Sequence, residues 1–388
     1  MSDTRTSVAL LGATGSIGVQ TLDVLRREPD RFQLISLAGG EQLSELAATA
    51  REFNVREIAV KSERHRDELA DLLGSGVDIL VGDEGLDALA READIVVNAV
   101  LGFAGLPVTL GALAAGKRLA LANKESLIAA SPLVAKVRDT PGAELVPIDS
   151  EHCAIHQCLA GSPAVAGHPD VKRLLLTASG GPFRGWNVDA LKDARKEDAL
   201  RHPTWSMGQK ITIDSSTLMN KGLEVLEAAA LFGINVDRVD VVVHPQSIVH
   251  SMVEYVDGSV LAQLSRPDMR LPIAYCLGLP DRLPHGYGAI DFTSSMELTF
   301  EPPDHEAFPA ITLAYEAARL GGAAPAWLSA ANEVAVDAFL SDRINWCDII
   351  PVVQATMAHY DGQQLESLSS LYENDGEARR CARASLKR

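Results

Sequence analysis

A glycine-rich turn near the start of the chain limits the possible folds more than any other segment. Residues 8–11 (VALL) predict a buried strand, and residues 19–27 have the apolar spacing of a helix. Between them lies GATGSIG, and a second apolar strand follows at residues 32–37. Strand, turn, helix and strand within about 30 residues form the unit of a dinucleotide site, whose glycines let backbone amides approach a pyrophosphate. The spacing is G-x-x-G-x-x-G rather than G-x-G-x-x-G, so a plain turn is the alternative.

Further apolar segments continue this pattern. Short strands are predicted at residues 58–60, 78–81, 95–98 and 118–122, with helices such as 41–53 and 106–115 between several of them. Alternating strands and helices predict a mostly parallel, doubly wound sheet with its ligand crevice at the strand C-termini. Asn98–Gly102 and Asn123–Glu125 follow two of these strands. Lys124 is a surface charge in one interpretation and faces the crevice in the other.

Two carboxylates follow the strand at residues 145–148. Asp149 and Glu151 are two positions apart, and in an extended chain such residues point to the same side. Clustered carboxylates repel each other unless a cation or proton lies between them, and their oxygens suit Mg²⁺ or Mn²⁺. The alternative is a solvated polar strand end.

Three later segments add polar groups. Residues 174–182 predict a strand that runs into a Ser-Gly-Gly turn at Ser179, which can offer amides and a hydroxyl to an oxyanion. Residues 202–208 place Trp205 between proline and glycine, as in a loop that closes over a ligand or a core tryptophan on a turn. Residues 211–227 predict a short strand, a capping region near Ser215, and a helix.

The predicted helix brings three polar side chains to one face. Asn220 and Glu224 are four positions apart, and Lys221 and Glu224 are three apart. One interpretation is a surface Lys–Glu pair worth only a few tenths of a kcal/mol. The other is an amide, an ammonium and the upstream Ser215 hydroxyl that bind a phosphate, with Glu224 as a third metal ligand. Together these segments indicate a nucleotide-linked enzyme with a metal and an anionic substrate.

Composition limits the partners. The chain has 388 residues with 35 basic and 52 acidic side chains, a net charge of −17, which argues against nucleic-acid or membrane partners. Five cysteines without a C-x-x-C pair indicate neither a zinc site nor a disulfide framework. Residues 96–116 carry no charge, but four glycines and one proline favour a strand, a loop and a helix over a membrane span. We expect a soluble, cytoplasmic protein.

Seven motifs resemble a known family. In order they are GATGSIG, LANKES, PIDSEHCAI, TASGGPFR, HPTWSMGQKITIDSSTLMNKGLEVLEA, HPQSIVHSMVEYVDGSVLAQLSRPDMRLPIAY and AANEVAVDAFL. They are similar to the 1-deoxy-D-xylulose 5-phosphate reductoisomerases, over about residues 7–340. The resemblance implies metal-dependent rearrangement and NADPH-dependent reduction of 1-deoxy-D-xylulose 5-phosphate to 2-C-methyl-D-erythritol 4-phosphate, in non-mevalonate isoprenoid biosynthesis. It also implies a homodimer.

The resemblance assigns roles to individual residues. It implies a site for Mg²⁺ or Mn²⁺ made of Asp149, Glu151 and Glu224. It implies catalytic roles for these three carboxylates and for Lys124 and His202. The implied substrate contacts are Ser150, Ser179, His202, Trp205, Met207, Ser215, Asn220 and Lys221, with Trp205 and Met207 on a mobile flap. The implied NADPH contacts are Gly12, Thr14, Gly15, Ser16, Ile17, Gly18, Gly39, Gly40, Glu41, Asn123, Glu125 and Gly208.

Glu41 departs from the family pattern. Many members have a small or basic residue here, near the 2′-phosphate of the cofactor, whereas this chain reads Gly39-Gly40-Glu41-Gln42. An acidic side chain in this position favours the free ribose hydroxyl of NAD. Alternatively, Glu41 caps the following helix and points away, as the acidic preference of a first helical turn allows. We expect NADPH.

The expected fold class is α/β with three folded domains. A doubly wound, Rossmann-like, NADPH-binding domain spans residues 1–149, and a central α/β catalytic domain with the flap spans 150–278. A linker rich in Pro and Gly covers 279–308, and a small helical domain covers 309–388, with helices expected at 310–320, 325–340 and 349–359.

Two other functions remain. Another NAD(P)-linked dehydrogenase, such as a relative of homoserine dehydrogenase, has no need for Asp149, Glu151 and Glu224 together. A catalytically inactive nucleotide-binding sensor binds cofactor without turnover.

Overall fold

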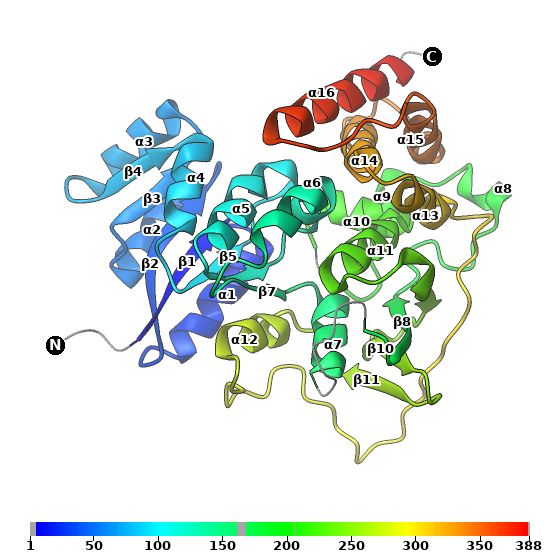
Figure 1. Cartoon of the computed structure of the whole chain (residues 1–388), viewed down its shortest axis with the longest axis horizontal. Coiled ribbons are helices and arrows are strands. Elements are labelled where there is room, and N and C mark those ends of the chain that lie inside the picture. Colours follow the sequence, from blue (N-terminus) through cyan, green and yellow to red (C-terminus); the bar gives the residue numbers. More distant parts are fainter. Residues whose placement is uncertain (1–4, 161–167, 206, 387–388) are drawn as a thin grey trace. The chain divides into compact units, whose positions relative to one another are not determined.

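The computed structural model describes residues 5–160, 168–205 and 207–386 (Figure 1). The chain divides into two compact units. Unit 1 comprises Met1–Leu127, Leu133–Cys153 and Asp268–Tyr287, and unit 2 comprises Ile128–Pro132, Ala154–Pro267 and Gly288–Arg388. The four-part division at residues 149, 278 and 308 stays a prediction.

Unit 1 is built on a seven-stranded parallel sheet with the order β4-β3-β2-β1-β5-β6-β7, which confirms the predicted Rossmann-like fold (Figure 1). Parallel strands are covered on both faces and are therefore continuously apolar. Val8–Leu11 in β1 are accordingly 0% exposed. The strands are β1 (Thr6–Leu11), β2 (Phe32–Gly39), β3 (Glu57–Val60), β4 (Asp78–Val81), β5 (Ile95–Asn98), β6 (Arg118–Leu121) and β7 (Glu144–Pro147).

Helices alternate with these strands, as the sequence predicts. They are α1 (Ser16–Arg27), α2 (Leu43–Phe53), α3 (Glu63–Leu73), α4 (Gly82–Ala90), the short 3₁₀ helix η1 (Gly102–Gly105), α5 (Leu106–Ala114), α6 (Lys124–Val137), α7 (Ser150–Leu159) and α12 (Arg270–Gly278). Residues 96–116 form a strand, a loop and helices, as expected. Within the described ranges, no helix combines the length and the apolar character that crossing a bilayer demands.

Unit 2 contains a four-stranded mixed sheet with the order β11-β10-β8-β9, in which β8 and β9 are parallel and the other pairs antiparallel. Its strands are β8 (Val171–Ala178), β9 (Val239–Val243), β10 (Val249–Tyr255) and β11 (Val260–Leu264). Helix α11 (Met219–Phe232) packs on β8 and β9 through Val225 and Ala228, which are both 0% exposed.

The remaining helices of unit 2 form its C-terminal part. They are α8 (Val188–Leu191), α9 (Lys196–Ala199), α10 (Gln209–Ser216), η2 (Val236–Arg238), α13 (Ala310–Leu320), α14 (Ala324–Leu340), η3 (Trp346–Asp348), α15 (Ile349–Met357) and α16 (Leu368–Ser385). Trp327 in α14 is 1% exposed and donates from its indole nitrogen to Asn374 of α16 at 3.0 Å. Between α12 and α13 the described chain has no helix or strand apart from a bridge at Glu301.

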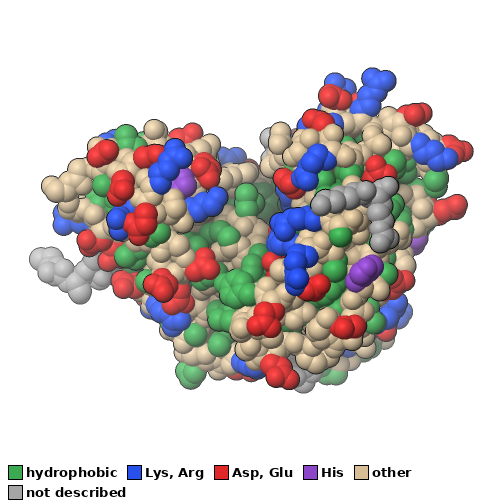
Figure 2. Space-filling view, turned by 90° about the horizontal axis from the view of Figure 1, so that it is seen from above, with side chains coloured by type: hydrophobic (Ala, Val, Ile, Leu, Met, Phe, Trp, Pro, Cys, Tyr) green, Lys and Arg blue, Asp and Glu red, His purple; other side chains and the backbone are tan. Residues whose placement is uncertain are grey.

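Acidic and basic side chains are interspersed on the face of the molecule seen in Figure 2. Because the net charge is −17, a binding site for an anion must depend on local donors rather than on a broad basic surface.

Two local expectations are wrong. Residues 211–213, predicted as a strand, lie in α10, where the Thr212 hydroxyl donates to the Gly208 carbonyl at 2.9 Å and packing against α14 outweighs β-propensity. Asp149 and Glu151 are not in extended chain, because α7 begins at Ser150.

The structure also excludes one of the two interpretations of Glu41. Glu41 does not cap α2, whose N-cap is Gln42. Its carboxylate instead lies beside Lys61 and His65, at 3.3 and 3.4 Å, because the ends of β2 and β3 bring these side chains within reach.

A buried histidine makes unit 2 sensitive to acid. His250 in β10 is 5% exposed, and its Nε2 lies 3.2 Å from the Ser265 carbonyl oxygen. Burial lowers the pKa of His250 to about 4, and the nearby His244 and Lys221 act in the same direction, while hydrogen bonds to the Ser265 and Arg266 backbone oppose it. His250 is therefore neutral at pH 7.

We expect unit 2 to lose stability as the pH falls from 6.5 toward 4, because over this range the unfolded chain protonates residue 250 and the folded chain does not. Above pH 6.5 the effect is absent. The His250→Asn variant should lose about 2 kcal/mol less than the unchanged protein between pH 7 and pH 5. Urea unfolding followed by tryptophan fluorescence measures this, since Trp186, Trp205, Trp327 and Trp346 all belong to unit 2.

His359→Asn is the control, because His359 is exposed. An identical pH dependence in the unchanged protein and in His250→Asn would contradict the assignment.

Candidate active site

The glycine turn joins β1 to α1. Gly12 has φ +99°, and a Cβ there would lie 2.3 Å from the Ala99 carbonyl oxygen. A Cβ on Gly18 would lie 2.3 Å from the Gly12 carbonyl oxygen, so only glycine allows α1 to begin this close to the turn. The N-cap residue Gly15 provides no side-chain cap. The first amides of α1 therefore remain suited to an anion.

The other predicted cofactor residues lie at the same edge of the sheet or at helix starts. Gly39 ends β2, and the open surroundings of Gly40 would accept a Cβ without contact. Asn123 is only 2% exposed; its side chain caps α6 by accepting from the Ser126 amide at 2.8 Å and donates to the Gly102 carbonyl at 2.6 Å. Asn123 thus holds the start of η1, and direct contact with a cofactor stays a prediction.

Lys124, Asp149 and His152 form a buried charged cluster in unit 1. The Lys124 ammonium lies 2.5 Å from Asp149 Oδ2, and His152 Nδ1 lies 3.4 Å from Asp149 Oδ1. Their side chains are 6%, 12% and 0% exposed. Lys124 is therefore not a surface charge. Sequence reasoning did not include His152, although its position three residues after Asp149 in a helix start is the signal that would have found it.

The pKa of Asp149 reflects this cluster. Burial alone raises the pKa of Asp149, but the charge of Lys124 and the hydrogen bond and charge of His152 outweigh it and hold the pKa well below its usual range. The Glu151 amide donates to Asp149 Oδ1 at 3.3 Å, so Asp149 also caps α7. Next to it, the Ser150 hydroxyl donates to the Glu151 carboxylate. Asp149 therefore presents ionised oxygens at neutral pH.

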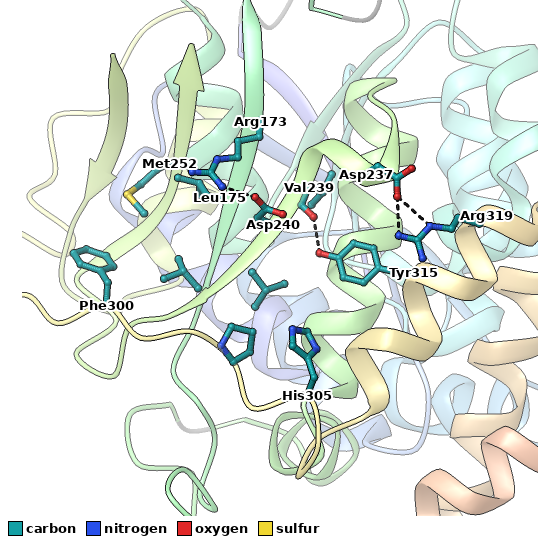
Figure 3. A pocket seen from close by; sticks show the side chains of 13 residues that line it. Arg173, Leu175, Asp237, Val239, Asp240, Met252, Phe300, His305, Tyr315 and Arg319 are labelled. Carbon is teal, nitrogen blue, oxygen red and sulfur yellow. Dashed lines mark hydrogen bonds and ion pairs between the residues drawn. The ribbon is translucent and has the colours of Figure 1, made fainter. Parts of the chain in front are cut away.

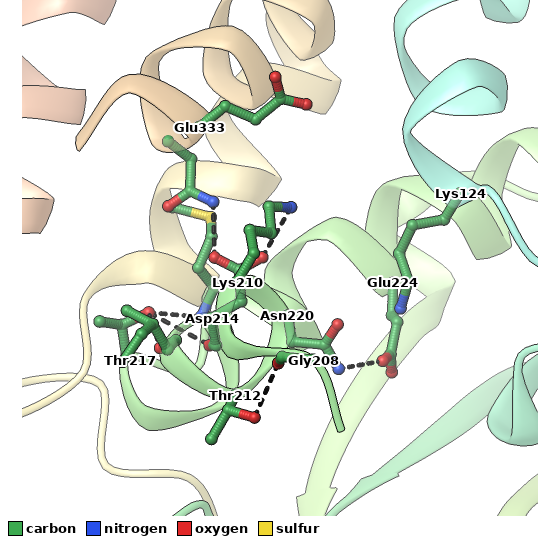
Figure 4. A network of polar contacts seen from close by, with 12 residues as sticks. Lys124, Gly208, Lys210, Thr212, Asp214, Thr217, Asn220, Glu224 and Glu333 are labelled. Carbon is green, nitrogen blue, oxygen red and sulfur yellow. Dashed lines mark hydrogen bonds and ion pairs between the residues drawn. The ribbon is translucent and has the colours of Figure 1, made fainter. Parts of the chain in front are cut away.

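A second buried charged cluster lies in unit 2, at the start of α11. The Asn220 amide donates to the Glu224 carboxylate (Figure 4). The Lys221 ammonium donates to the same carboxylate. The Lys221 and Glu224 side chains are only 4% and 2% exposed, so they are not the solvated surface pair of the alternative interpretation. Ser215, near the end of α10, is 8% exposed.

The α10 helix is held by polar contacts that the sequence did not indicate. Asp214 is 1% exposed, and its carboxylate accepts from Lys210 at 2.8 Å (Figure 4). It also accepts from the Asn332 amide of α14 at 2.7 Å. Lys210 and Asp214 are four positions apart in the sequence, as in a helical ion pair. We did not predict this pair because residues 211–213 were predicted as a strand.

Ser179 and His202 form a third polar group. His202 Nδ1 accepts from the amides of Thr204 and Trp205, at 3.1 and 2.9 Å, so the imidazole hydrogen lies on Nε2, 3.0 Å from Ser179 Oγ. Burial lowers the pKa of His202 to about 4, in agreement with a neutral ring. Ser179 Oγ also accepts from the Gly181 amide at 3.2 Å. With two donors on its oxygen, the Ser179 hydroxyl hydrogen is directed to a further acceptor.

The predicted flap residues lie between His202 and α10. The Trp205 ring is 6.2 Å from the His250 ring, and Gly208 is the N-cap of α10. Trp205 and Met207 are partly buried, and Ser206 lies outside the described residues. Movement of this segment stays a prediction.

A cavity of about 610 Å³ lies elsewhere in unit 2, on β8, β9 and β10 (Figure 3). Its wall includes the Arg319–Asp237 ion pair at 2.7 Å and Tyr315, which donates to the Val239 carbonyl at 2.5 Å. None of the predicted site residues lines it.

Comparison with known proteins gives consistent results along the chain. Residues 8–131 match the family "1-deoxy-D-xylulose 5-phosphate reductoisomerase", and residues 145–232 and 264–381 match two C-terminal domains of the same family. The reductoisomerase of Chlorobaculum tepidum is 48% identical over 380 residues, 97% of this chain and 98% of the relative. That of Laribacter hongkongensis is 48% identical over 386 residues, 98% of this chain and 99% of the relative.

Solved structures agree. The reductoisomerase from Zymomonas mobilis in complex with NADPH is 42% identical with a TM-score of 0.91, covering 99% of this chain and 100% of that one. A reductoisomerase in complex with NADPH, fosmidomycin and magnesium is 44% identical with a TM-score of 0.92, covering 98% of both chains. The sequence matches extend over nearly the whole length of the chain, so it belongs to the 1-deoxy-D-xylulose 5-phosphate reductoisomerase family.

Proposed function

We propose that this chain converts 1-deoxy-D-xylulose 5-phosphate to 2-C-methyl-D-erythritol 4-phosphate with NADPH and a divalent metal ion. The observation that carries this function is the match to reductoisomerases over nearly the full length of the chain. The buried polar clusters around Asp149, Glu224 and Ser179 support it, because they supply the types of group that a metal and a phosphate require.

The metal would be held by the carboxylates of Asp149, Glu151 and Glu224, the set that the resemblance to the family implies. Their chemistry fits Mg²⁺ or Mn²⁺, which bind carboxylate oxygens. The low pKa of Asp149 keeps its oxygens ionised, and Glu224 is a buried carboxylate that two donors already stabilise. Burying such carboxylates costs free energy unless positive charge lies nearby. A divalent ion would add its charge to the charges of Lys124 and Lys221.

The substrate phosphate would be bound by Ser179, Ser215, Asn220 and Lys221, with His202 orienting Ser179. The Ser179 hydroxyl donates outward because the His202 and Gly181 donors occupy its oxygen. Lys221 supplies the positive charge, and its burial strengthens the interaction with an anion. Binding this remote group provides energy that orients the reacting end.

At the reacting end, Lys124 and Ser150 would contact the hydroxyl and carbonyl region. When bound, the metal polarises the substrate oxygens and NADPH supplies the hydride that reduces the rearranged aldehyde. Trp205 and Met207 would cover the substrate and exclude water during the rearrangement. The glycine turn at Gly12–Gly18 would hold the cofactor pyrophosphate, and Gly39, Gly40, Glu41, Asn123, Glu125 and Gly208 complete the proposed cofactor contacts.

The test is loss of NADPH absorbance with 1-deoxy-D-xylulose 5-phosphate and Mn²⁺. We expect rapid oxidation that a chelator abolishes, and at least about a 100-fold loss of kcat in Glu224→Gln, because one metal ligand loses its charge. Mn²⁺ binding, measured by electron paramagnetic resonance, should weaken in the same variant.

Glu316→Gln, on the exposed face of α13, is the matched control and should retain full activity and Mn²⁺ affinity. If the folded protein with metal oxidises no NADPH, the proposed function fails. If activity persists without metal, the alternative of a metal-independent dehydrogenase gains support.

For the phosphate site, we expect Ser179→Ala to raise KM about tenfold while kcat changes less, because a hydroxyl donor to the non-reacting phosphate is lost. Steady-state kinetics over a substrate series measures both constants. Ser369→Ala, at an exposed serine of α16, is the control. A change confined to kcat would place Ser179 at the reacting end instead.

We further propose a homodimer formed through β11. This strand is at the edge of its sheet, with Val260, Leu261 and Leu264 exposed by 48%, 49% and 36%. Exposed edge strands pair readily with another chain, and contiguous apolar side chains favour burial. Phe292 and Phe300, which are 74% and 44% exposed, add apolar surface in the segment before α13. A cytoplasmic location stays a prediction.

The double variant Leu261→Lys/Leu264→Lys should sediment as a 41.4 kDa monomer, whereas the unchanged protein should sediment as a dimer, because lysines at the edge oppose strand pairing. Leu320→Lys, at an apolar residue of α13 that is 59% exposed, is the control and should leave the dimer intact. A dimer in all three proteins would show that β11 is not the interface.

A further inference from the structure

The carboxyl ends of β2 and β3 bring together an acidic and two basic side chains. In the parallel pairing of these strands Gly39 lies opposite Val60, so Glu41 and Lys61 both follow a strand end at the same edge. β2 also pairs with β1, and the glycine turn that follows β1 lies at this edge too. This is the position in which a Rossmann-like fold holds the adenosine ribose of a dinucleotide.

Glu41 is engaged by two donors. Its Oε1 lies 3.3 Å from Lys61 Nζ, and its Oε2 lies 3.4 Å from His65 Nε2. Both contacts lower the pKa of Glu41. Ser62 Oγ, 2.8 Å from His65 Nδ1, orients the ring so that Nε2 faces the carboxylate. The Glu41 and Lys61 side chains are 74% and 70% exposed, so solvent can reach both. The His65 ring, which Ser62 orients, is only 14% exposed.

The two neighbouring arginines form their ion pairs with other carboxylates. Arg64 pairs with Glu68 at 2.8 Å, and Arg66 pairs with Glu63 at 2.5 Å. Lys61 is therefore the cation that pairs with Glu41 at the strand ends, and it precedes Ser62, the N-cap of α3, whose N-terminus adds positive potential.

A carboxylate and a phosphate monoester are both oxygen anions and are bound by the same ammonium and imidazole donors. We propose that Lys61 and His65 bind the 2′-phosphate of NADPH, and that Glu41 occupies these donors until the phosphate displaces it. Glu41 is then an internal competitor that weakens NADPH binding and sets the preference between NADPH and NADH. This inference depends on the proposed function, because it takes NADPH as the cofactor.

The experiment measures the Kd of NADPH, NADH and 2′-AMP for the full chain by isothermal titration calorimetry, with no substrate present. We expect Lys61→Ala to weaken NADPH and 2′-AMP about tenfold while NADH changes less than twofold, because only the phosphate loses a charged donor. Glu41→Gln should tighten NADPH and 2′-AMP about threefold, as expected for removing an exposed competing charge. Lys61→Arg should restore most of the binding that Lys61→Ala loses.

Two control variants change the net charge by the same amounts as Lys61→Ala and Glu41→Gln, but at residues outside the group of Glu41, Lys61 and His65. Arg64→Ala removes a cation that pairs with Glu68, and Glu45→Gln removes an exposed acid from the first turn of α2. Both should leave all three Kd values within twofold. Because Glu41 and Lys61 are exposed, equal thermal unfolding midpoints are expected for all variants and verify that they are folded.

The outcomes distinguish failure of this inference from failure of the proposed NADPH-dependent function. If the unchanged protein binds NADPH, but Lys61→Ala weakens NADPH and NADH equally or Glu41→Gln leaves their ratio unchanged, this inference alone is overturned. If Glu41→Gln weakens NADH and spares NADPH, Glu41 holds a ribose hydroxyl and the inference is also overturned. If the unchanged protein binds neither NADPH nor 2′-AMP, the proposed cofactor itself is wrong.

Discussion

In unit 1, every strand of a parallel sheet ends at the same edge, and the position of its polar groups depends on this constraint. The Gly12 turn follows β1, Lys61 follows β3, Lys124 follows β6 and Asp149 follows β7. These segments are far apart in the chain, yet each begins where an apolar strand stops. The apolar strands therefore position the polar residues, and substitutions in the buried strands would displace several candidate site residues together.

Buried charge is the second organising feature. Asp149 in unit 1 and Glu224 in unit 2 are carboxylates with little access to water, and each is bound by an ammonium, Lys124 or Lys221. Without such partners their burial would cost several kcal/mol. For Asp149, the charges of Lys124 and His152 also hold the pKa well below its usual range, so the groups that make its burial tolerable keep its oxygens ionised for a cation.

Local sequence patterns predicted some of these features well. The strands at 78–81 and 95–98 begin and end where expected, and the four-residue spacing of Asn220 and Glu224 correctly placed both on one face of a helix. The same reasoning failed at residues 211–213, where three residues with strand propensity lie in α10, held by its contacts with α14. It also failed at Asp149, for which it predicted extended chain, although aspartate is a common N-cap residue and α7 begins at Ser150.

The sequence alone determined the alternation of strands and helices, the glycine turn, the helical spacings and the resemblance to the reductoisomerases, because each is a property of neighbouring residues or of motif order. Only the tertiary structure decided which polar side chains contact each other. Lys124 binds Asp149, His202 orients Ser179, and Glu41 turns to Lys61 and His65 rather than to the start of α2. These partners lie 20 or more residues apart, and strand order and helix packing, not spacing along the chain, bring them within hydrogen-bonding distance.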